Sequence, residues 1–309
     1  MEAAEALHKK MFRLVLPISF QYFMSALVGV SDAVMLGKLN QNSMSAVSLA
    51  SQVTFVFNLF MTALIIGENM FAAQYYGKLF LISSLFFSDK LMYIFTDEKD
   101  LIIMGSEYLR YVGISYLFSA ISQVCLTIMK NCGAVNQSSV ISSMTVILNI
   151  ILNAVLIFGL FGFPAMGIKG AALATVIATA VQMAFCVSHI KIKMKQLKVR
   201  LLKKNHNLEK QFWTKVTPVL FNELIWGCGF TMYSVIMGHL GADAVAANSI
   251  ANISKNLVVC FCLGLGSGGS IIVGNELGAG HFEEAKRVGG ILTKASIVGG
   301  FLSGLFAQM

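Results

Sequence analysis

The stretch NCGAVNQSSVISSMTVILNIILNAVLIFGLFGFPAMGI, at positions 131–168, contains no charged residue over its 38 positions. A helix crosses the hydrocarbon core of a bilayer in about 20 residues, so this stretch is too long for one crossing. The Gly162-Phe163-Pro164 sequence near its end is a turn signal. We therefore predict two membrane-spanning helices here, the second of which continues through 170–188.

The composition of the whole chain agrees with a membrane protein. Its 309 residues are 56% hydrophobic and 12% charged, with a formal net charge of +8 and a mean hydropathy of +0.73. A soluble domain carries about 25% charged residues, so this chain cannot cover itself with a polar surface. This excludes a water-soluble enzyme and a nucleic-acid-binding module, and we expect neither nucleic acid nor a resident cofactor as a partner.

Other long apolar runs predict further spans. They lie at 14–37, 46–67, 111–129, 216–242, 256–275 and 291–309. The run LFLISSLFFSDKLMYIF at 79–95 fits less well, because Asp89 and Lys90 interrupt it and its uncharged part is too short to cross alone.

The charge distribution predicts the orientation. Basic clusters at 8–13 and 191–210 should both be cytoplasmic by the positive-inside rule, which requires an even number of spans between them. Counting the 79–95 run gives six spans. We therefore predict that this run crosses, that the N-terminus is cytoplasmic and that the acidic cluster at 97–100 lies outside.

The chain also contains an internal repeat with a shift of 201 residues. Matching pairs include Pro17 with Pro218, Gly37 with Gly238, Ser48 with Ser249, and Gly67 with Gly268. Because six spans separate equivalent helices, both copies have the same orientation, as in transporters built from parallel repeats. We predict an all-α polytopic bundle with two lobes of about six and three helices, at 1–190 and 212–309, joined by a basic cytoplasmic linker at 191–211.

Six motifs together resemble the multidrug and toxic compound extrusion (MATE) family. They are SDAVMLGKL (31–39), AAQYYGK (72–78), NIILNAVLIFG (149–159), GIKGAALATVIA (167–178), TPVLFNE (217–223) and VGNELGAG (273–280). The resemblance implies a monomeric secondary antiporter in the bacterial inner membrane, not an enzyme. It would export organic cations or other amphiphiles in exchange for H⁺ or Na⁺ by rocking of two helical bundles.

The sequence departs from the family pattern at three places. Family members have about twelve helices, of which the last three are absent here, and part of the third helix is missing after Lys78. The fifth-helix motif NxxxD carries Asn153 at its last position. A non-transporting remnant is therefore one alternative. A lipid-linked precursor flippase is another, disfavoured because the spans contain acids and almost no Arg or Lys.

Asp32 lies inside the first predicted span. A carboxylate within the membrane costs about 2.5–3.5 kcal/mol on insertion scales, which favours a functional role. We expect Asp32 to bind and release a proton or a sodium ion. The alternative is an interfacial acid that reaches water, since Lys38 is only six residues away.

Asn149 and Asn153 are four residues apart and therefore share one helix face. They could supply neutral oxygen ligands to a small cation beside Asp32. Thr175 resembles a further polar residue of that site in the family. The alternative for all three is hydrogen bonding between helices. With Asn153 in place of an acid, Asp32 is the only titrating group of the site, which weakens it for sodium.

Glu223 resembles the acid that family members carry in their second half for cations or cationic drugs. The repeat pairs Tyr22 with Glu223 and Asp32 with Tyr233, so the two halves hold their acids at different depths. The alternative is an acid near the inner interface. The run GLGSGG at 264–269 follows no strand and precedes no GK[ST], so we expect close helix packing or a bend there.

Overall fold

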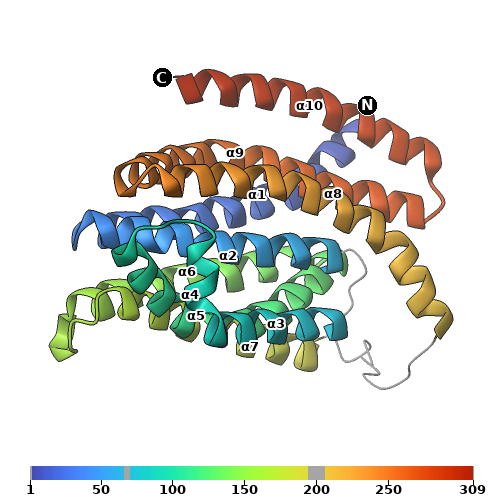
Figure 1. The fold of residues 1–309 in the computed structure, drawn as a ribbon. Helices are drawn as coiled ribbons and strands as arrows, with labels where there is room; N and C mark the ends of the chain where they lie inside the picture. The colour runs from blue at the N-terminus through green and yellow to red at the C-terminus, as the bar shows by residue number, and fades with distance from the viewer. Residues whose placement is uncertain (1, 66–69, 194–205, 309) are drawn as a thin grey trace. The chain divides into compact units, whose positions relative to one another are not determined.

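The computed structural model describes residues 2–65, 70–193 and 206–308, and every regular element in these ranges is a helix (Figure 1). Seven helices in these ranges are long and apolar enough to cross a bilayer. The prediction of an all-α polytopic membrane protein is confirmed. The elements are α1 (Glu2–Gly37), α2 (Gln41–Ile65), α3 (Met70–Phe86), α4 (Ser88–Tyr93), α5 (Lys99–Asn131), α6 (Val135–Phe158), η1 (Leu160–Gly162), α7 (Ile168–Lys193), α8 (His206–His239), α9 (Ala242–Gly278) and α10 (Phe282–Gln308).

The uncharged stretch forms the hairpin of α6 and α7 that the sequence predicts. The turn begins at Gly159, where φ is 74°, and Gly162 has φ 84°. Glycine adopts these positive φ angles without the steric cost that other residues incur. The two helices then approach closely, because a Cβ at Gly170 would lie 2.5 Å from the carbonyl oxygen of Leu156.

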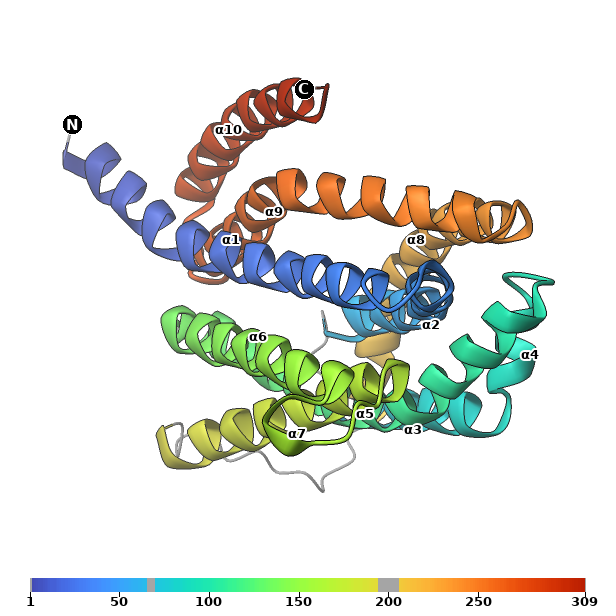
Figure 2. The same cartoon turned by 90° about the vertical axis from the view of Figure 1, so that its left-hand side faces the viewer.

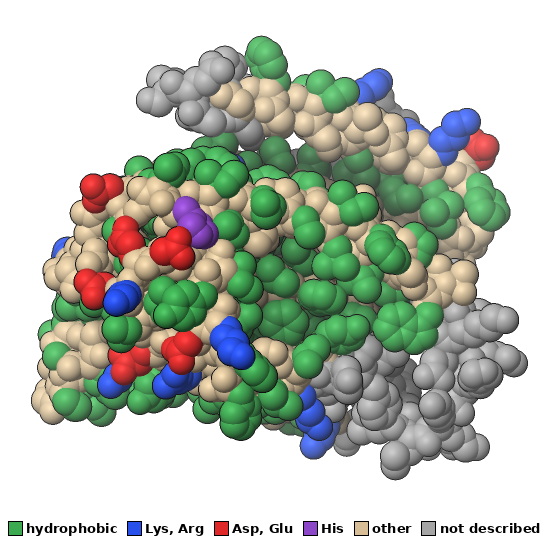
Figure 3. Space-filling model, in the orientation of Figure 1, with side chains coloured by type: hydrophobic (Ala, Val, Ile, Leu, Met, Phe, Trp, Pro, Cys, Tyr) green, Lys and Arg blue, Asp and Glu red, His purple; other side chains and the backbone are tan. Residues whose placement is uncertain are grey.

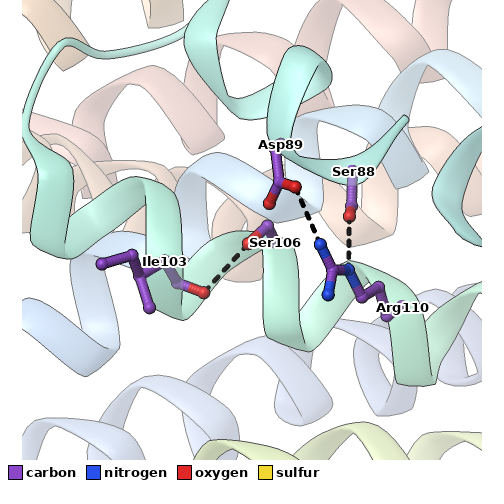
Figure 4. A network of polar contacts seen from close by, with 5 residues as sticks. All are labelled: Ser88, Asp89, Ile103, Ser106 and Arg110. Carbon is purple, nitrogen blue, oxygen red and sulfur yellow. Dashed lines mark hydrogen bonds and ion pairs between the residues drawn. The ribbon is translucent and has the colours of Figure 1, made fainter. Parts of the chain in front are cut away.

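The run at 79–95 is not one helix. Helix α3 ends at Phe86, and the short helix α4 follows. Arg110 of α5 holds this break in place, because its Nε donates to Ser88 Oγ at 2.9 Å and its Nη2 pairs with Asp89 at 2.8 Å (Figure 4). The apolar helix α3 thus ends just before the charged residues Asp89 and Lys90. That this run crosses the membrane stays a prediction.

Helix α5 lies between α3 and α7, as two views show (Figures 1 and 2). Helix α3 continues without interruption through 78–79, and a Cβ at Gly77 would lie 3.0 Å from the Ala120 Cβ of α5. On the other side, Lys169 of α7 pairs with Glu107 of α5 at 2.8 Å. Helix α5 is therefore packed on two sides, and its most apolar part is 56% buried, the largest share among the seven membrane-length helices of the described residues.

The chain divides into two compact units. One unit contains Met1–Val30, Met129–Val146 and Ile250–Met309, and the other contains Ser31–Ile128 and Ile147–Ser249. We call them unit 1 and unit 2. Each unit combines helices from both halves of the sequence.

The predicted lobes and linker are a different division of the chain. The lobe boundaries at 1–190 and 212–309 follow the sequence repeat and stay a prediction. Most of the basic linker at 191–211 lies outside the described residues, since 194–205 are not among them.

In unit 1, α1 and α9 pack through glycines. A Cβ at Gly264 would overlap Ser19 of α1, and one at Gly268 would lie 3.1 Å from the Cα of Val15. The GLGSGG run therefore provides the close packing that the sequence predicts, since only glycine lets two helix backbones approach in this way.

In unit 2, α8 and α2 form the equivalent pair. Val216 is buried against Ala63 and Leu64, and Leu220 packs beside them. With the 201-residue shift, Val15 and Ser19 of α1 correspond to Val216 and Leu220 of α8. Equivalent residues thus form equivalent helix contacts, which supports the internal repeat.

One hydrogen bond joins two equivalent residues directly. The hydroxyls of Ser48 on α2 and Ser249 on α9 are 201 positions apart and hydrogen-bonded to each other. Nearby, Ser45 Oγ donates to the carbonyl of Ala242 at 2.8 Å. Helices from the first and second sequence halves therefore meet at this point of unit 2.

Candidate functional site

Asp32 occupies the last turns of α1, where that helix belongs to unit 2. Its side chain is half-buried, and its Oδ1 accepts a hydrogen bond from the Nδ2 of Asn153. Lys38, the basic residue nearest in sequence, is exposed. The carboxylate is therefore held by a neutral amide from α6.

The two asparagines of α6 lie side by side, as their spacing predicts. Asn149 is 4% exposed and Asn153 is fully buried. The Nδ2 of Asn153 also donates to the Oδ1 of Asn149 at 3.2 Å, and Asn149 Nδ2 donates to Thr175 Oγ1 at 3.4 Å. The structure thus brings Asp32, Asn149, Asn153 and Thr175 into one connected group, which we call the Asp32 cluster.

One oxygen of the cluster has no hydrogen-bond donor among the described residues. The Oδ1 of Asn153 is buried and unpartnered. A buried polar atom without a partner costs about 1–3 kcal/mol, so such atoms call for an explanation. Carboxylate and amide oxygens together suit a small hard cation, and the carboxylate alone suits a proton.

Sequence reasoning missed Tyr108 of α5, which is 6% exposed. Its side chain lies near Thr175 and Asp32. The predicted span at 111–129 began too late to include it, whereas α5 begins at Lys99. Tyr108 therefore closes the side of the Asp32 cluster that faces α5.

A periodic pattern could have identified this residue. Buried positions recur every four residues along α5, and Tyr116 repeats the tyrosine two turns later. The hydroxyl of Tyr116 shares a hydrogen bond of 3.0 Å with Thr54 of α2. Tyrosines spaced in this way on an apolar helix indicate a face whose hydroxyls need buried partners.

The residues predicted for a substrate or a second cation, Glu223, Tyr22 and Tyr233, are divided between the two units. Glu223 is half-buried on α8, and Tyr233 is 47% exposed on the same helix. Tyr22 belongs to unit 1, where its hydroxyl shares a hydrogen bond of 2.9 Å with Ser267 of α9. Within the described part of unit 2, none of the hydrogen bonds connects Glu223 or Tyr233 to Asp32.

Glu223 shares its part of α8 with aromatic rings. Trp226 and Phe230 have ring centroids 4.5 Å apart, and Phe55 of α2 lies 6.0 Å from Trp226 and 6.5 Å from Phe230. Both α8 rings are substantially exposed. The surroundings of this acid are therefore aromatic, in contrast to the amides around Asp32.

A polar group surrounds the junction of α8 and α9. The backbone N–H of Ala242 donates to Glu98 at 3.1 Å, and His239 lies 3.5 Å from Asp97. Figure 3 shows acidic side chains gathered at this end of the face, beside a histidine. The predicted acidic cluster at 97–100 thus contributes to the start of α9, while its position outside the cell stays a prediction.

The MatE family model matches this chain at 17–80, 78–155 and 218–308, which is more than half of its length. The first and last matches begin 201 residues apart, in agreement with the repeat. The first two segments meet at 78–80, where the sequence indicates that part of the third helix is missing.

Relatives with assigned names are similar over most of the chain. The "Probable multidrug resistance protein NorM" of Thermotoga maritima is 25% identical over 93% of this chain and 67% of its own length. The "Uncharacterized transporter YisQ" of Bacillus subtilis is 22% identical over 89% of this chain and 66% of its own. This chain thus spans about two thirds of their length.

Solved structures share the fold. The MATE multidrug transporter DinF-BH superposes with a TM-score of 0.83 at 17% identity, covering 96% of this chain and 71% of that one. A MATE structure in the straight conformation gives a TM-score of 0.77 at 18% identity, with 97% and 72% covered.

Proposed function

This chain belongs to the MatE family, and from that premise we propose that it is a secondary active antiporter. It exports organic cations or other amphiphilic compounds in exchange for H⁺ or Na⁺. The observation that carries this proposal is the Asp32 cluster, in which a carboxylate within a membrane-spanning helix is held by the buried Asn153.

Asp32 acts as the coupling group. The ionised carboxylate accepts a charge-assisted hydrogen bond from Asn153, which links α1 to α6. Protonation weakens that bond, and a sodium ion would compete for the same carboxylate. Either ion therefore changes how strongly these two helices are joined.

For sodium, the ligands would be the Asp32 carboxylate and the amide oxygens of Asn149 and Asn153. The unpartnered Oδ1 of Asn153 supports this assignment. The site has one carboxylate, so it holds one negative charge. A proton forms a covalent O–H bond with this one carboxylate, whereas Na⁺ is held by electrostatic attraction and is bound less strongly by one negative charge than by two. For this reason we favour H⁺ over Na⁺ as the coupling ion.

Export requires access to alternate between the two sides of the membrane. The contacts of Ser48 with Ser249 and of Ser45 with Ala242 join the two sequence halves. These contacts would separate when that end of the protein opens. The transporter works as a monomer in the bacterial inner membrane, with its N-terminus in the cytoplasm and no enzymatic activity.

Glu223 is the second acid of the transport path and attracts cationic substrates. Tyr22 and Tyr233 occupy the repeat positions opposite the two acids and serve as polar wall residues. The spans contain few basic residues, which disfavours a flippase for anionic lipid precursors.

A non-transporting remnant is the second candidate. Only 11% of the most apolar part of α8 is buried, compared with 56% for α5. A wall helix that is so little covered lacks the packing on which rocking of two bundles depends, which favours a chain that does not transport. This candidate predicts a membrane-inserted chain without export.

Export from efflux-deficient bacterial cells separates the candidates. The wild-type chain should lower the cellular accumulation of a fluorescent organic cation, and D32N should restore accumulation to the level of cells without the chain. D100N, which neutralises an exposed acid in the first turn of α5, is the matched control and should export normally. Immunoblots of membranes confirm equal amounts. Export by D32N at the wild-type level would overturn the coupling role, and absence of export by the wild type would favour the remnant.

A further inference from the structure

The turn between α8 and α9 packs against the connection between α4 and α5, at 94–98, and both segments belong to unit 2. A Cβ at Gly238 would overlap the carbonyl oxygen of Phe95, and one at Gly241 would lie 3.0 Å from a carboxylate oxygen of Glu98. The connection comes from the first half of the sequence and the turn from the second half. The two sequence halves are therefore in close contact here as well.

Glu98 binds the first turn of α9. The backbone N–H of Ala242 donates to the Glu98 carboxylate at 3.1 Å. An N–H group in the first turn of a helix has no carbonyl of its own helix to bond, so the acceptor has to come from elsewhere. This hydrogen bond therefore exists only while the connection and the turn are in contact.

His239 makes two contacts at the end of α8, one through each ring nitrogen. Its Nδ1 lies 2.9 Å from the carbonyl oxygen of Val235, and its Nε2 lies 3.5 Å from the carboxylate of Asp97. A carbonyl oxygen and an ionised carboxylate only accept hydrogen bonds, so each nitrogen needs a hydrogen for its contact to be attractive. Only the protonated ring carries both hydrogens. In the neutral ring, one nitrogen directs a lone pair at an oxygen, and that contact becomes repulsive.

Acids outnumber bases on the segments that meet at this turn, and Figure 3 shows acidic side chains beside the histidine. The charged residues are Asp97, Glu98, Lys99 and Asp100 around the start of α5, Asp243 in the first turn of α9, and Lys38 before α2. Two of the acids have other partners, since Glu98 accepts from Ala242 and Asp243 accepts from Gln41. Between pH 5 and 8, histidine is the side chain that ordinarily changes charge.

We propose that His239 and Asp97 form a pH-sensitive latch, which holds the 94–98 connection against the α8–α9 turn while His239 is protonated and releases it when the proton is lost. The inference rests on the proposed alternation of access, because opening of this end separates the two segments. The two side chains are 42% and 83% exposed, and an exposed ion pair changes an equilibrium by about two- to fivefold. Acid on this side of the membrane therefore favours the closed form, and a rise in pH favours the open one.

The amide of Ala242 reports on the latch directly. Hydrogen–deuterium exchange of this amide is measured on the full chain in lipid nanodiscs at pH 5.5 and pH 8, and each rate is divided by the intrinsic exchange rate at that pH. The resulting protection factor measures how much of the protein is closed at this point. We expect the protection factor to be about two- to fivefold greater at pH 5.5 than at pH 8.

Variants of the ion pair test the cause of the pH dependence. H239Q and D97N should each bring the ratio of the two protection factors to about one. H239K keeps a positive charge over the whole range, so its protection at pH 8 should be as high as at pH 5.5. H281N is the matched control, because His281 of unit 1 is another exposed histidine, 3.0 Å from Glu276. It should leave the wild-type ratio unchanged.

Equal ratios in the wild type and H239Q would overturn the latch, and so would greater protection of the wild type at pH 8. The outcomes also separate this inference from the proposed function. If cells export cations while the protection of Ala242 does not respond to pH, the latch is wrong and transport stands. If the protection responds as expected and H239Q removes the response while no export occurs, the latch stands and transport is wrong.

Discussion

The helix pair α1–α9 in unit 1 and the pair α8–α2 in unit 2 are equivalent under the 201-residue repeat, yet they pack by different means. In unit 1, Gly264 lets the backbones approach so closely that a Cβ would overlap Ser19. In unit 2, the equivalent position is Ala63, which packs against Val216 in an ordinary apolar cluster. The comparison shows that after a duplication the same pairs of helices can stay in contact while the distance between their backbones changes.

The polar groups of the two copies differ more than the packing. Asp32 of α1 is held by Asn153, whereas its repeat partner Tyr233 on α8 is an exposed ring. The reverse holds at Glu223, whose repeat partner is Tyr22. Packing positions constrain volume and persist in both copies, whereas the Asp32 carboxylate needs the amide of Asn153 and occurs in one copy only.

The largest expected effect separates the two copies at equivalent positions. D32N removes the charge that couples ion and substrate and should reduce efflux from cells to the background level. Y233F, at the equivalent position, keeps the exposed ring and removes only the hydroxyl of a wall residue, so it should lower the efflux rate by only about twofold. Fluorescent cation efflux from cells with matched membrane abundance measures both. Equal losses in the two variants would contradict the asymmetry of the repeat.

The next effect concerns the tight pair. G264A places a methyl group against the backbone of α1, which cannot give way, and should lower the free energy of unfolding by about 3 kcal/mol. A Cβ added at Gly266 would have no atom within 4 Å. G266A is therefore the matched control and should be neutral or slightly stabilising. Unfolding in detergent, followed by helical circular dichroism, measures the difference. Similar stability of the two variants would mean that α1 and α9 are not in close contact.

A smaller effect is expected in the other pair. A methyl group at position 227 meets the flexible end of the Leu59 side chain, which can change rotamer, so G227A should cost about 1 kcal/mol. G229A, with no atom within 4 Å of its Cβ, is the control. The same unfolding measurement applies. A loss for G227A as large as that for G264A would remove the difference between the two helix pairs.

The smallest effect concerns the point where equivalent residues meet. S48A should cost about 0.5–1.5 kcal/mol, the net value of one hydrogen bond. S48C combined with S249C should form a disulfide on mild oxidation, visible as an altered gel mobility that a reductant reverses. T62C with S249C is the control and should not cross-link, because Thr62 is exposed and farther along α2. Absence of a cross-link in the first variant would contradict the contact.

The hairpin of α6 and α7 could be predicted from the sequence because the uncharged stretch is too long for one membrane crossing and contains a turn signal. The grouping of Asn149 with Asn153 followed from helical spacing alone. Their contact with Asp32 rested on resemblance, since no local pattern relates α1 to α6. The break between α3 and α4 was not predicted, because the role of Asp89 depends on Arg110, which lies 21 residues away. Tyr108 was missed because the start of the predicted span was set by the uncharged run at 111–129, whereas the buried face of α5 continues toward Lys99.

Ion-driven release from vesicles tests the central claim, that Asp32 couples ion and substrate, most directly. Vesicles containing the chain are loaded with an organic cation, and a proton or a sodium gradient is then imposed. The account predicts that the wild type releases the cation only when a gradient is present, with protons more effective than sodium, and that D32N releases none. Gradient-driven release by D32N at the wild-type rate would contradict it.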